Sequence, residues 1–249
     1  MTRYSSKLLA PQTLFNTTTN NTLLQQRERA WQIFPYPCIG LVGFLDFTLS
    51  TMPSYSDILS SLSNKDGAAT LLDVGCCVGQ DLRKLVVDGA PGSQLAGVEL
   101  KAEYIELGYD LFLDRGRFES HFVVGDVFDH IPMKNLHGKF DFVHAASFLH
   151  LWAWDGQIDA ASQLMQFLKD KAGTVILGKQ VGKSTPGEYP EPVAANGVNY
   201  LHDTYTFEKM WNEIGERTKT KWKVEASMRC AVAGRSPVEL LFFEATRVE

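Results

Sequence analysis

TLLDVGCCVGQDLRKL, residues 70–85, joins a short apolar run to a glycine-rich turn and then to a helical pattern. The apolar run ends at Val74, the turn spans Gly75–Gly79, and Leu82 and Leu85 have the spacing of one helix face. A strand, turn and helix of this kind bring bare backbone close to a ligand and point the N–H groups of a helix N-terminus at it. The stretch therefore predicts a nucleotide-binding unit at the centre of an α/β fold.

The glycine spacing differs from that of the two common phosphate-binding loops. A dinucleotide fingerprint requires G-x-G-x-x-G, and a P-loop ends in Gly-Lys followed by Ser or Thr. Here the pattern is Asp73-x-Gly75-x-Cys77-x-Gly79, with Cys77 in place of a middle glycine, so that a positive φ at Cys77 costs conformational energy. Glu99 ends the next apolar run, 20 positions after Gly79, where an acid can accept hydrogen bonds from ribose hydroxyls.

Length and composition indicate a single α/β unit with an appendage. A chain of 249 residues with 45% hydrophobic content can bury a full core. The net charge of −5 and the lack of a Lys/Arg stripe disfavour a nucleic-acid partner. The four cysteines form no C-x-x-C pair, which favours a reduced, cytoplasmic protein over a zinc or disulfide framework. The apolar stretch Cys38–Met52 contains Asp46 and is too short for a membrane span.

The chain divides into an N-terminal arm and helical cap, residues 1–66, and a ligand-binding domain, residues 67–249. Residues 1–20 are polar and predict a mobile arm. Helices are expected from Asn21 to the prolines at 35 and 37, over Ile39–Thr51 and over Ser54–Leu62. Added helices before the first strand are suited to covering a reaction site at the sheet edge.

Strands and helices then alternate, which predicts a doubly wound, mostly parallel sheet. The expected strands are Thr70–Val74, Leu95–Leu100, Ser120–Val124, Phe140–Ala146 and Thr174–Lys179, with a final antiparallel pair, Lys221–Met228 and Val238–Thr246. The expected helices are Leu82–Val87, Ala102–Leu113, Gln157–Lys169 and Thr206–Ile214. The Gly- and Pro-rich segment 182–205 is too long for an ordinary connection and predicts a lid or substrate loop.

Acids end each strand of the first half of the sheet: Asp73, Glu99 and Asp126. Because the carboxyl edge of a parallel sheet is where ligands lie, they indicate one nucleoside-sized cationic ligand. For Glu99 and Asp126, the alternatives are a solvated strand end and a turn acid. His150 and His202 are candidate general bases, and for each a hydrogen-bonded structural histidine is the alternative.

Aromatic residues near the strand ends supply a candidate substrate wall: Tyr36, Phe148, Trp152 and Trp154. Aromatic side chains at such positions also occur as plain core, so this alternative stays open. A metal site at this edge would need three acidic side chains. The sequence offers no such set apart from the acids already assigned to the ligand, so no metal is predicted.

The pattern Asp73-x-Gly75-x-Cys77-x-Gly79 resembles the first motif of class I S-adenosylmethionine-dependent methyltransferases, D-x-G-x-G-x-G, and departs from it at Cys77. FPYPCIG at 34–40, the glycine turn with its doubled cysteine, ELGYDLFLDR at 106–115 and FLHLW at 148–152 resemble fungal methyltransferases of meroterpenoid and related secondary metabolism. The resemblance implies a methyltransferase sheet with a terminal antiparallel hairpin, and transfer of methyl to a carboxylate or hydroxyl oxygen of a small molecule.

The resemblance also implies roles for individual residues. Cofactor contacts are expected from Asp73, Gly75, Cys77, Gly79, Glu99, Leu100, Asp126, Val127 and His144. A methyltransferase fold reused for cyclisation or isomerisation is the alternative activity, and a non-catalytic regulatory subunit is a third. A small-molecule substrate is the expected partner, without nucleic acid or membrane, and a homodimer is left open.

Overall fold

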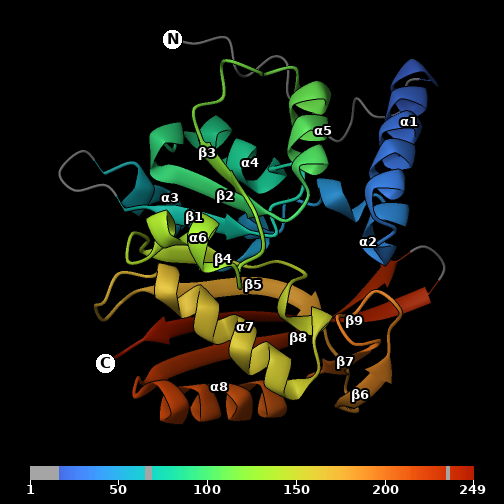
Figure 1. Ribbon diagram of the computed structural model, residues 1–249. Coiled ribbons are helices and arrows are strands. Elements are labelled where there is room, and N and C mark those ends of the chain that lie inside the picture. Colours follow the sequence, from blue (N-terminus) through green and yellow to red (C-terminus); the bar gives the residue numbers. More distant parts are fainter. Residues whose placement is uncertain (1–16, 65–68, 234–235) are drawn as a thin grey trace.

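The computed structural model describes residues 17–64, 69–233 and 236–249. A seven-stranded sheet in the order β3-β2-β1-β4-β5-β9-β8 forms its centre (Figure 1). Its strands are β1 (Leu71–Val74), β2 (Leu95–Glu99), β3 (His121–Val124), β4 (Phe142–His144), β5 (Val175–Val181), β8 (Trp222–Ala233) and β9 (Ser236–Arg247). The first five are parallel, whereas β9 is antiparallel to both β5 and β8. The predicted doubly wound sheet with a terminal antiparallel hairpin is confirmed.

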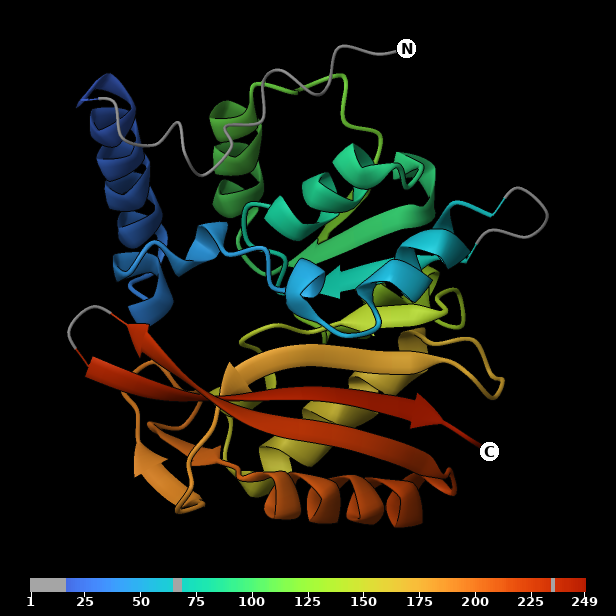
Figure 2. The ribbon, with the colours of Figure 1, turned by 180° about the vertical axis from the view of Figure 1, so that it is seen from behind.

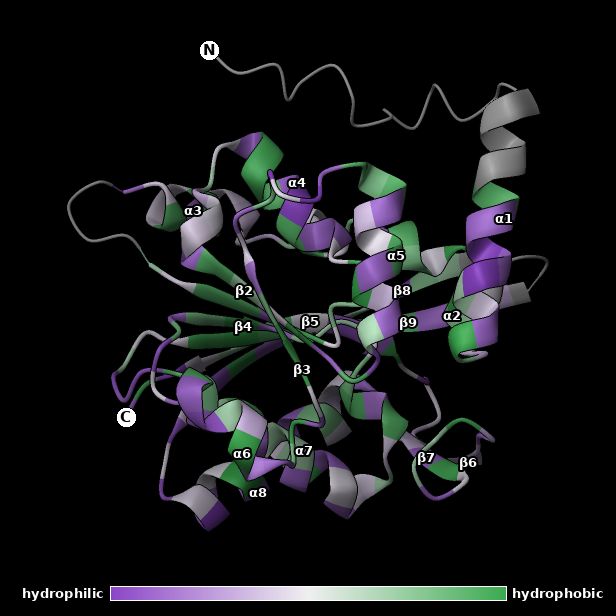
Figure 3. Ribbon diagram, turned by 45° about the horizontal axis from the view of Figure 1, so that its top comes forward, coloured by the Kyte–Doolittle hydropathy of each residue, from purple (hydrophilic) through white to green (hydrophobic). Residues whose placement is uncertain are grey.

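Helices cover both faces of this sheet, as Figure 3 shows. On one side lie α3 (Tyr55–Leu62), α4 (Gln80–Asp88) and α5 (Ala102–Phe112), and on the other α6 (His130–Met133), α7 (Trp154–Phe167) and α8 (Thr204–Thr218). The central strands β1 and β2 are buried on both faces, and most of their residues are accordingly apolar. Alternate residues of β1 illustrate this: Leu72 and Val74 join the core under α7 and α8, and Leu71 joins the core under α3 and α4.

The N-terminal segment, residues 17–64, lies along α4, from Asp81 at its start to Asp88 at its end, and beside α5; we call it the cap segment (Figure 2). It contains α1 (Thr17–Ile33), α2 (Pro37–Gly40), the 3-10 turns η2 (Gly43–Leu45) and η3 (Leu49–Thr51), and α3. α1 begins at Thr17, and the remainder of the expected arm, residues 1–16, lies outside the described residues.

The expected helix over Ile39–Thr51 is wrong. The chain there makes only short turns, because Val42 adopts a left-handed φ of 63° between Gly40 and Gly43 and ends α2. These turns bury Ile39, Phe44 and other apolar side chains against the glycine turn and α5 without forming a long helix.

The segment 182–205 is not an irregular loop. It contains a separate two-stranded antiparallel sheet, β6 (Gly187–Pro190) and β7 (Val198–Leu201). Backbone N–H groups of Ala195 and Tyr200 donate to the carbonyl oxygens of Leu151 and Trp152 at 3.0 Å. We call this unit the β6–β7 hairpin, and it is bonded to the turn η6 (Leu149–Leu151) that follows β4.

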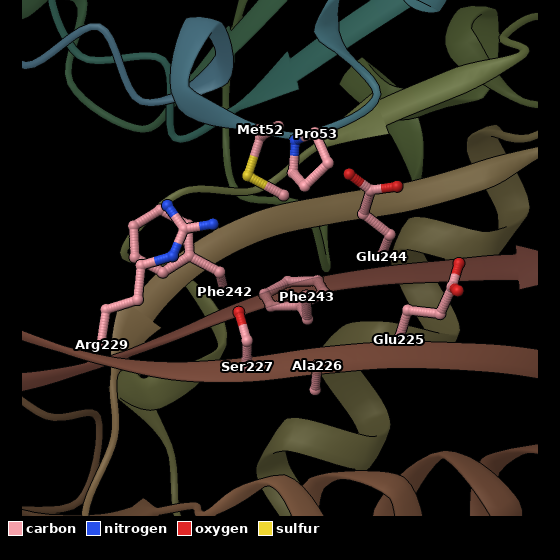
Figure 4. Close-up of a pocket in the computed structure, with 9 residues that line it drawn as sticks. All are labelled: Met52, Pro53, Glu225, Ala226, Ser227, Arg229, Phe242, Phe243 and Glu244. Carbon is pink, nitrogen blue, oxygen red and sulfur yellow. The ribbon is translucent and has the colours of Figure 1, made fainter.

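A cavity of about 270 Å³ opens between Met52 and Pro53 of the cap segment and the strands β8 and β9 (Figure 4). Phe242, Arg229 and Glu244 are among its lining residues. In the sheet order β5 and β4 separate these strands from β1, so this cavity is away from the glycine turn and is not the site developed below.

Candidate cofactor and active site

The glycine turn lies at the carboxyl end of β1, in the middle of the sheet. Gly75, Cys77 and Gly79 have φ of 68°, 50° and 68°, and α4 starts immediately afterwards. Thus Cys77 adopts the left-handed conformation, which costs conformational energy for a residue with a Cβ, as the sequence analysis expected. Backbone N–H groups of Gly75 and Cys76 donate to the Val98 carbonyl of β2, which fixes the turn to the neighbouring strand.

Glu99 ends β2 directly beside this turn. One carboxylate oxygen accepts from the Cys77 N–H at 2.9 Å, and the other accepts from the Lys101 N–H at 3.0 Å. Burial raises the pKa of Glu99, and these backbone hydrogen bonds oppose the rise. Each carboxylate oxygen keeps an additional lone pair, so the group is preoriented to accept from two further donors such as vicinal hydroxyls.

Asp73 and His144 form a buried pair across β1 and β4, with His144 Nδ1 2.8 Å from an Asp73 oxygen. Burial lowers the pKa of His144, but the charge and hydrogen bond of Asp73 outweigh it and the net shift is upward. Asp81 lies nearby at the start of α4, and burial raises its pKa to about 6. Asp81 also accepts from the Leu49 N–H at 2.9 Å and so joins the cap segment to the glycine turn.

Asp126 follows β3 and forms a local turn, in which its carboxylate accepts from the Phe128 N–H at 3.0 Å. This is the arrangement expected for a turn acid. Val127 is buried in the core, and Leu100 beyond β2 is half exposed. The three residues therefore lie at the same strand-end edge as Glu99, although their side chains have different surroundings.

Aromatic rings line the edge next to the glycine turn. A Cβ built on Gly75 comes within 3.2 Å of the Phe148 ring, which shows that this ring lies against the turn. Phe148 contacts Trp152 with ring centroids 5.1 Å apart, and Trp152 contacts Phe128 at 5.8 Å. Phe128 was missed in the sequence because an exposed aromatic in a turn carries no periodic signal.

Tyr36 belongs to the cap segment and approaches the same edge from α2. Its ring packs on Phe34 with centroids 4.4 Å apart. Burial, then the charge of Glu99, raises the pKa of the Tyr36 hydroxyl. The structure thus brings Tyr36 to the neighbourhood of Glu99 and Cys77.

His150 lies in η6, close to the ammonium group of Lys179 on β5. Burial, and secondarily the charge of Lys179, lowers the pKa of His150 to about 4, so the imidazole is neutral near pH 7. The Lys179 side chain is only 15% exposed, and its Nζ is 3.7 Å from the Asp46 carboxylate of the cap segment. The sequence did not mark Lys179 as a candidate site residue, because a lysine at the end of an expected strand is usually exposed to solvent.

His202 occupies a different environment from His150. Its ring is fully buried among Tyr200, Trp154 and Phe207, with centroids 4.6 to 5.5 Å away. Its Nδ1 is 3.2 Å from the Thr206 hydroxyl in the first turn of α8, and burial lowers its pKa to about 4. The ring therefore supports the junction of the β6–β7 hairpin and α8, and the structure does not bring it together with Glu99 and the glycine turn.

Among residues 17–64, 69–233 and 236–249, no group of three His, Cys, Asp or Glu side chains is placed to hold a metal ion. None of the helices in those ranges combines the length and apolar character needed to cross a membrane.

The strand order, the glycine turn after β1 and the acid that ends β2 define a class I methyltransferase fold. Residues 71–171 match a methyltransferase domain model, and residues 19–45 match a meroterpenoid methyltransferase N-terminal domain. A curated fungal methyltransferase is 34% identical to the chain over 226 residues, which cover 77% of that relative, so the chain belongs to the fungal methyltransferases of secondary metabolism. The predicted cofactor, S-adenosylmethionine, is the methyl donor of such enzymes.

Three relatives show the extent of the match. O-methyltransferase phiE of a fungal species is 41% identical over 200 residues, which cover 80% of this chain and 66% of the length of phiE. O-methyltransferase atr3 of Stereocaulon alpinum is 39% identical, covering 81% and 58%. Methyltransferase adrK of Penicillium roqueforti is 34% identical, covering 87% and 77%. The chain thus spans somewhat less than two thirds of phiE and atr3.

Solved structures agree on the fold. The CurJ carbon methyltransferase superposes with a TM-score of 0.54 at 12% identity, over 96% of this chain and 70% of its own. The cyclase SpnF superposes with a TM-score of 0.53 at 15% identity, over 78% and 80%. At 12–15% identity these likenesses show the fold alone. They do not distinguish methyl transfer from cyclisation, which depends on the residues of the site.

Proposed function

We propose that this protein is an S-adenosylmethionine-dependent O-methyltransferase that acts on a small-molecule intermediate of fungal secondary metabolism. The observation that carries the proposal is the carboxylate of Glu99, bonded to the Cys77 N–H and placed beside the glycine turn. In this assignment Glu99 accepts from the ribose hydroxyls, and Gly75–Gly79 passes under the methionine portion. Asp126, Val127 and Leu100 border the adenine, and His144 holds Asp73 in place.

The cofactor supplies an activated methyl group on a sulfonium. The protein contributes by holding acceptor oxygen, methyl and sulfur in line, which lowers the barrier without covalent participation of a side chain. Phe148 and Trp152 form one wall of the acceptor side, and Tyr36 with the cap segment forms another. We propose the division into a cap, residues 1–66, and a cofactor-binding domain, residues 67–249, on the same basis.

Within this proposal a carboxylate acceptor fits better than a hydroxyl. A carboxylate is already ionised at neutral pH and needs no base, whereas a hydroxyl benefits from a base with a pKa near neutrality. Lys179 supplies a scarcely exposed positive charge beside His150, and the lowered pKa makes His150 a weak base. The buried surroundings of His202 support a structural role over the catalytic role that the sequence suggested.

The first test is calorimetric titration of the protein with S-adenosylhomocysteine, for which we expect one site per chain. Absence of binding contradicts the cofactor assignment. The second test incubates the protein with S-adenosylmethionine carrying a labelled methyl group and with a panel of hydroxylated aromatic carboxylic acids. A product in which the labelled methyl group replaces one hydrogen of the acceptor supports transfer, and an unlabelled product of unchanged mass supports cyclisation or isomerisation. Alkaline hydrolysis then distinguishes a methyl ester, which is cleaved, from a methyl ether, which is not.

Location and assembly remain proposals of the same kind. The cysteines at 38, 76, 77 and 230 are free thiols in the structure, which supports the proposed cytoplasmic environment. We keep a homodimer as an open proposal, to be tested by light scattering of the purified protein over a concentration series.

A further inference from the structure

Arg83 is a buried cation one turn into α4, directly behind the glycine turn. Only 3% of its surface is exposed, and its ion-pair partner Asp114, after α5, is similarly buried. The guanidinium is forked onto this carboxylate: Nε donates at 2.6 Å and Nη2 at 3.0 Å. Phe112 and Phe118 lie on the guanidinium at 4.6 and 4.5 Å from their ring centroids.

The third nitrogen of Arg83 bonds to the turn itself. Nη1 donates to the Val78 carbonyl at 2.6 Å and approaches the Gly79 carbonyl at 3.3 Å. The contact is close enough that a Cβ built on Gly79 lies 2.9 Å from Nη1. The Gly79 N–H also donates to the Cys76 carbonyl at 2.7 Å, and the Gly79 carbonyl also accepts from the Arg83 backbone N–H at 3.1 Å. The Arg83 side chain adds to these bonds a side-chain donor to the Val78 carbonyl, and so ties the end of the turn to the start of α4.

Stability alone is a poor explanation for this pair. Burying two ions costs several kcal/mol of desolvation each, and hydrophobic pairs of similar volume often replace buried ion pairs at no loss of stability. An apolar pair cannot donate hydrogen bonds to the Val78 and Gly79 carbonyls. The arrangement therefore indicates that the gain lies in the geometry of the turn.

We infer that Arg83, oriented by Asp114, is a positioning residue that holds the glycine turn in its cofactor-binding conformation. This inference deepens the proposed function and rests on it for the identity of the ligand. Arg83 acts through the backbone of Val78 and Gly79, and neither Arg83 nor Asp114 is assigned a contact with the cofactor.

The test compares wild type with the double variant Arg83→Met/Asp114→Leu. We expect a melting temperature close to that of wild type, but binding of S-adenosylhomocysteine at least about tenfold weaker, because a charge-assisted hydrogen bond to the turn is lost. Arg83→Lys keeps the charge without the fork, and we expect an intermediate loss of affinity. A double variant or an Arg83→Lys variant that binds S-adenosylhomocysteine as tightly as wild type overturns the inference.

A second measurement does not depend on the ligand. Hydrogen exchange followed by mass spectrometry is expected to show faster exchange in peptides covering residues 75–80 of Arg83→Lys and of the double variant, with other peptides unchanged. Unchanged exchange at residues 75–80 overturns the inference. This outcome is independent of the cofactor proposal, because the measurement uses no ligand.

Asp141 supplies the matched control. It is also buried, and it pairs with Lys169 at 2.6 Å, but it lies before β4, at the opposite end of the strands from the glycine turn. Asp141→Asn is expected to lower the melting temperature without changing affinity for S-adenosylhomocysteine or exchange at residues 75–80. Weakened binding in this control as well attributes the effect of Arg83 to general destabilisation and overturns the inference.

Discussion

Glu99→Gln separates the structural role of this carboxylate, which holds two backbone N–H groups, from its proposed role in binding the ribose. In wild type each Glu99 oxygen accepts a backbone N–H, from Cys77 at 2.9 Å and from Lys101 at 3.0 Å. Glutamine supplies one acceptor oxygen and one NH2 group, so that one of these N–H groups faces a donor. The lost charge-assisted bond is worth about 1.5–3 kcal/mol. Because the neutral amide avoids the cost of burying a charge, the net loss of folding stability is smaller than this.

The effect on ligand affinity follows from the same group. Loss of one charge-assisted bond to a ribose hydroxyl weakens binding by about 1.5–3 kcal/mol, which corresponds to roughly 10- to 150-fold in Kd. Calorimetric titration with S-adenosylhomocysteine measures this change, and a urea melt measures stability in parallel. Glu103→Gln, an exposed acid in the first turn of α5, is the matched control and should leave Kd unchanged.

The ribose contact can be isolated with the 2′-deoxy analogue of S-adenosylhomocysteine. If Glu99 binds the ribose hydroxyls, the difference in affinity between wild type and Glu99→Gln shrinks with this analogue. A folded Glu99→Gln variant that binds S-adenosylhomocysteine within twofold of wild type refutes the reasoning, because it leaves the carboxylate with only its structural role.

Three further outcomes follow from the same geometry. Cys77→Val should lower the urea-unfolding free energy by about 1–3 kcal/mol, since a β-branched residue is strained at the observed φ of 50°; a neutral result contradicts the left-handed turn. His150 and His202, whose pKa values burial lowers to about 4, bind fewer protons folded than unfolded, so their contribution to stability is present above pH 6.5 and lost toward pH 4. Replacing both with Gln should flatten stability against pH in that window, measured by thermal melts. Asp81 has the opposite sign, since burial raises its pKa to about 6: Asp81→Asn should be more stable than wild type at pH 7, with the difference vanishing near pH 4.

The order and type of the central elements could be predicted because their signals are local. Buried parallel strands appear as short apolar runs, and β1, β2 and the terminal pair β8–β9 were found from these runs and the turns between them. The β6–β7 hairpin was missed because its stability comes from bonds to Leu151 and Trp152, which no local pattern reveals. The helix expected over Ile39–Thr51 failed for a related reason: apolar content was present, but the left-handed φ of 63° at Val42 interrupts the helix, and no local pattern marks that residue.

The candidate site divides in the same way. Spacing alone placed Gly75, Gly79 and Glu99 together at one strand-end edge, and the structure has Glu99 beside the turn; their role in binding a ligand stays a prediction. Arg83 was not identified, because a charged residue in a helix normally reads as solvated and its partner Asp114 is distant in sequence. Burial of such a pair depends on which helices pack together, and that is a property of the tertiary structure.

The bonding of the β6–β7 hairpin to η6 has a consequence for exchanging parts among related enzymes. The N–H groups of Ala195 and Tyr200 donate to the carbonyl oxygens of Leu151 and Trp152, so the hairpin and the turn that contains His150 form one hydrogen-bonded unit. A chimera that takes the hairpin from a relative must also take residues 148–152 from that relative. Otherwise the two segments will not match, and the hydrogen bonds between them will be lost.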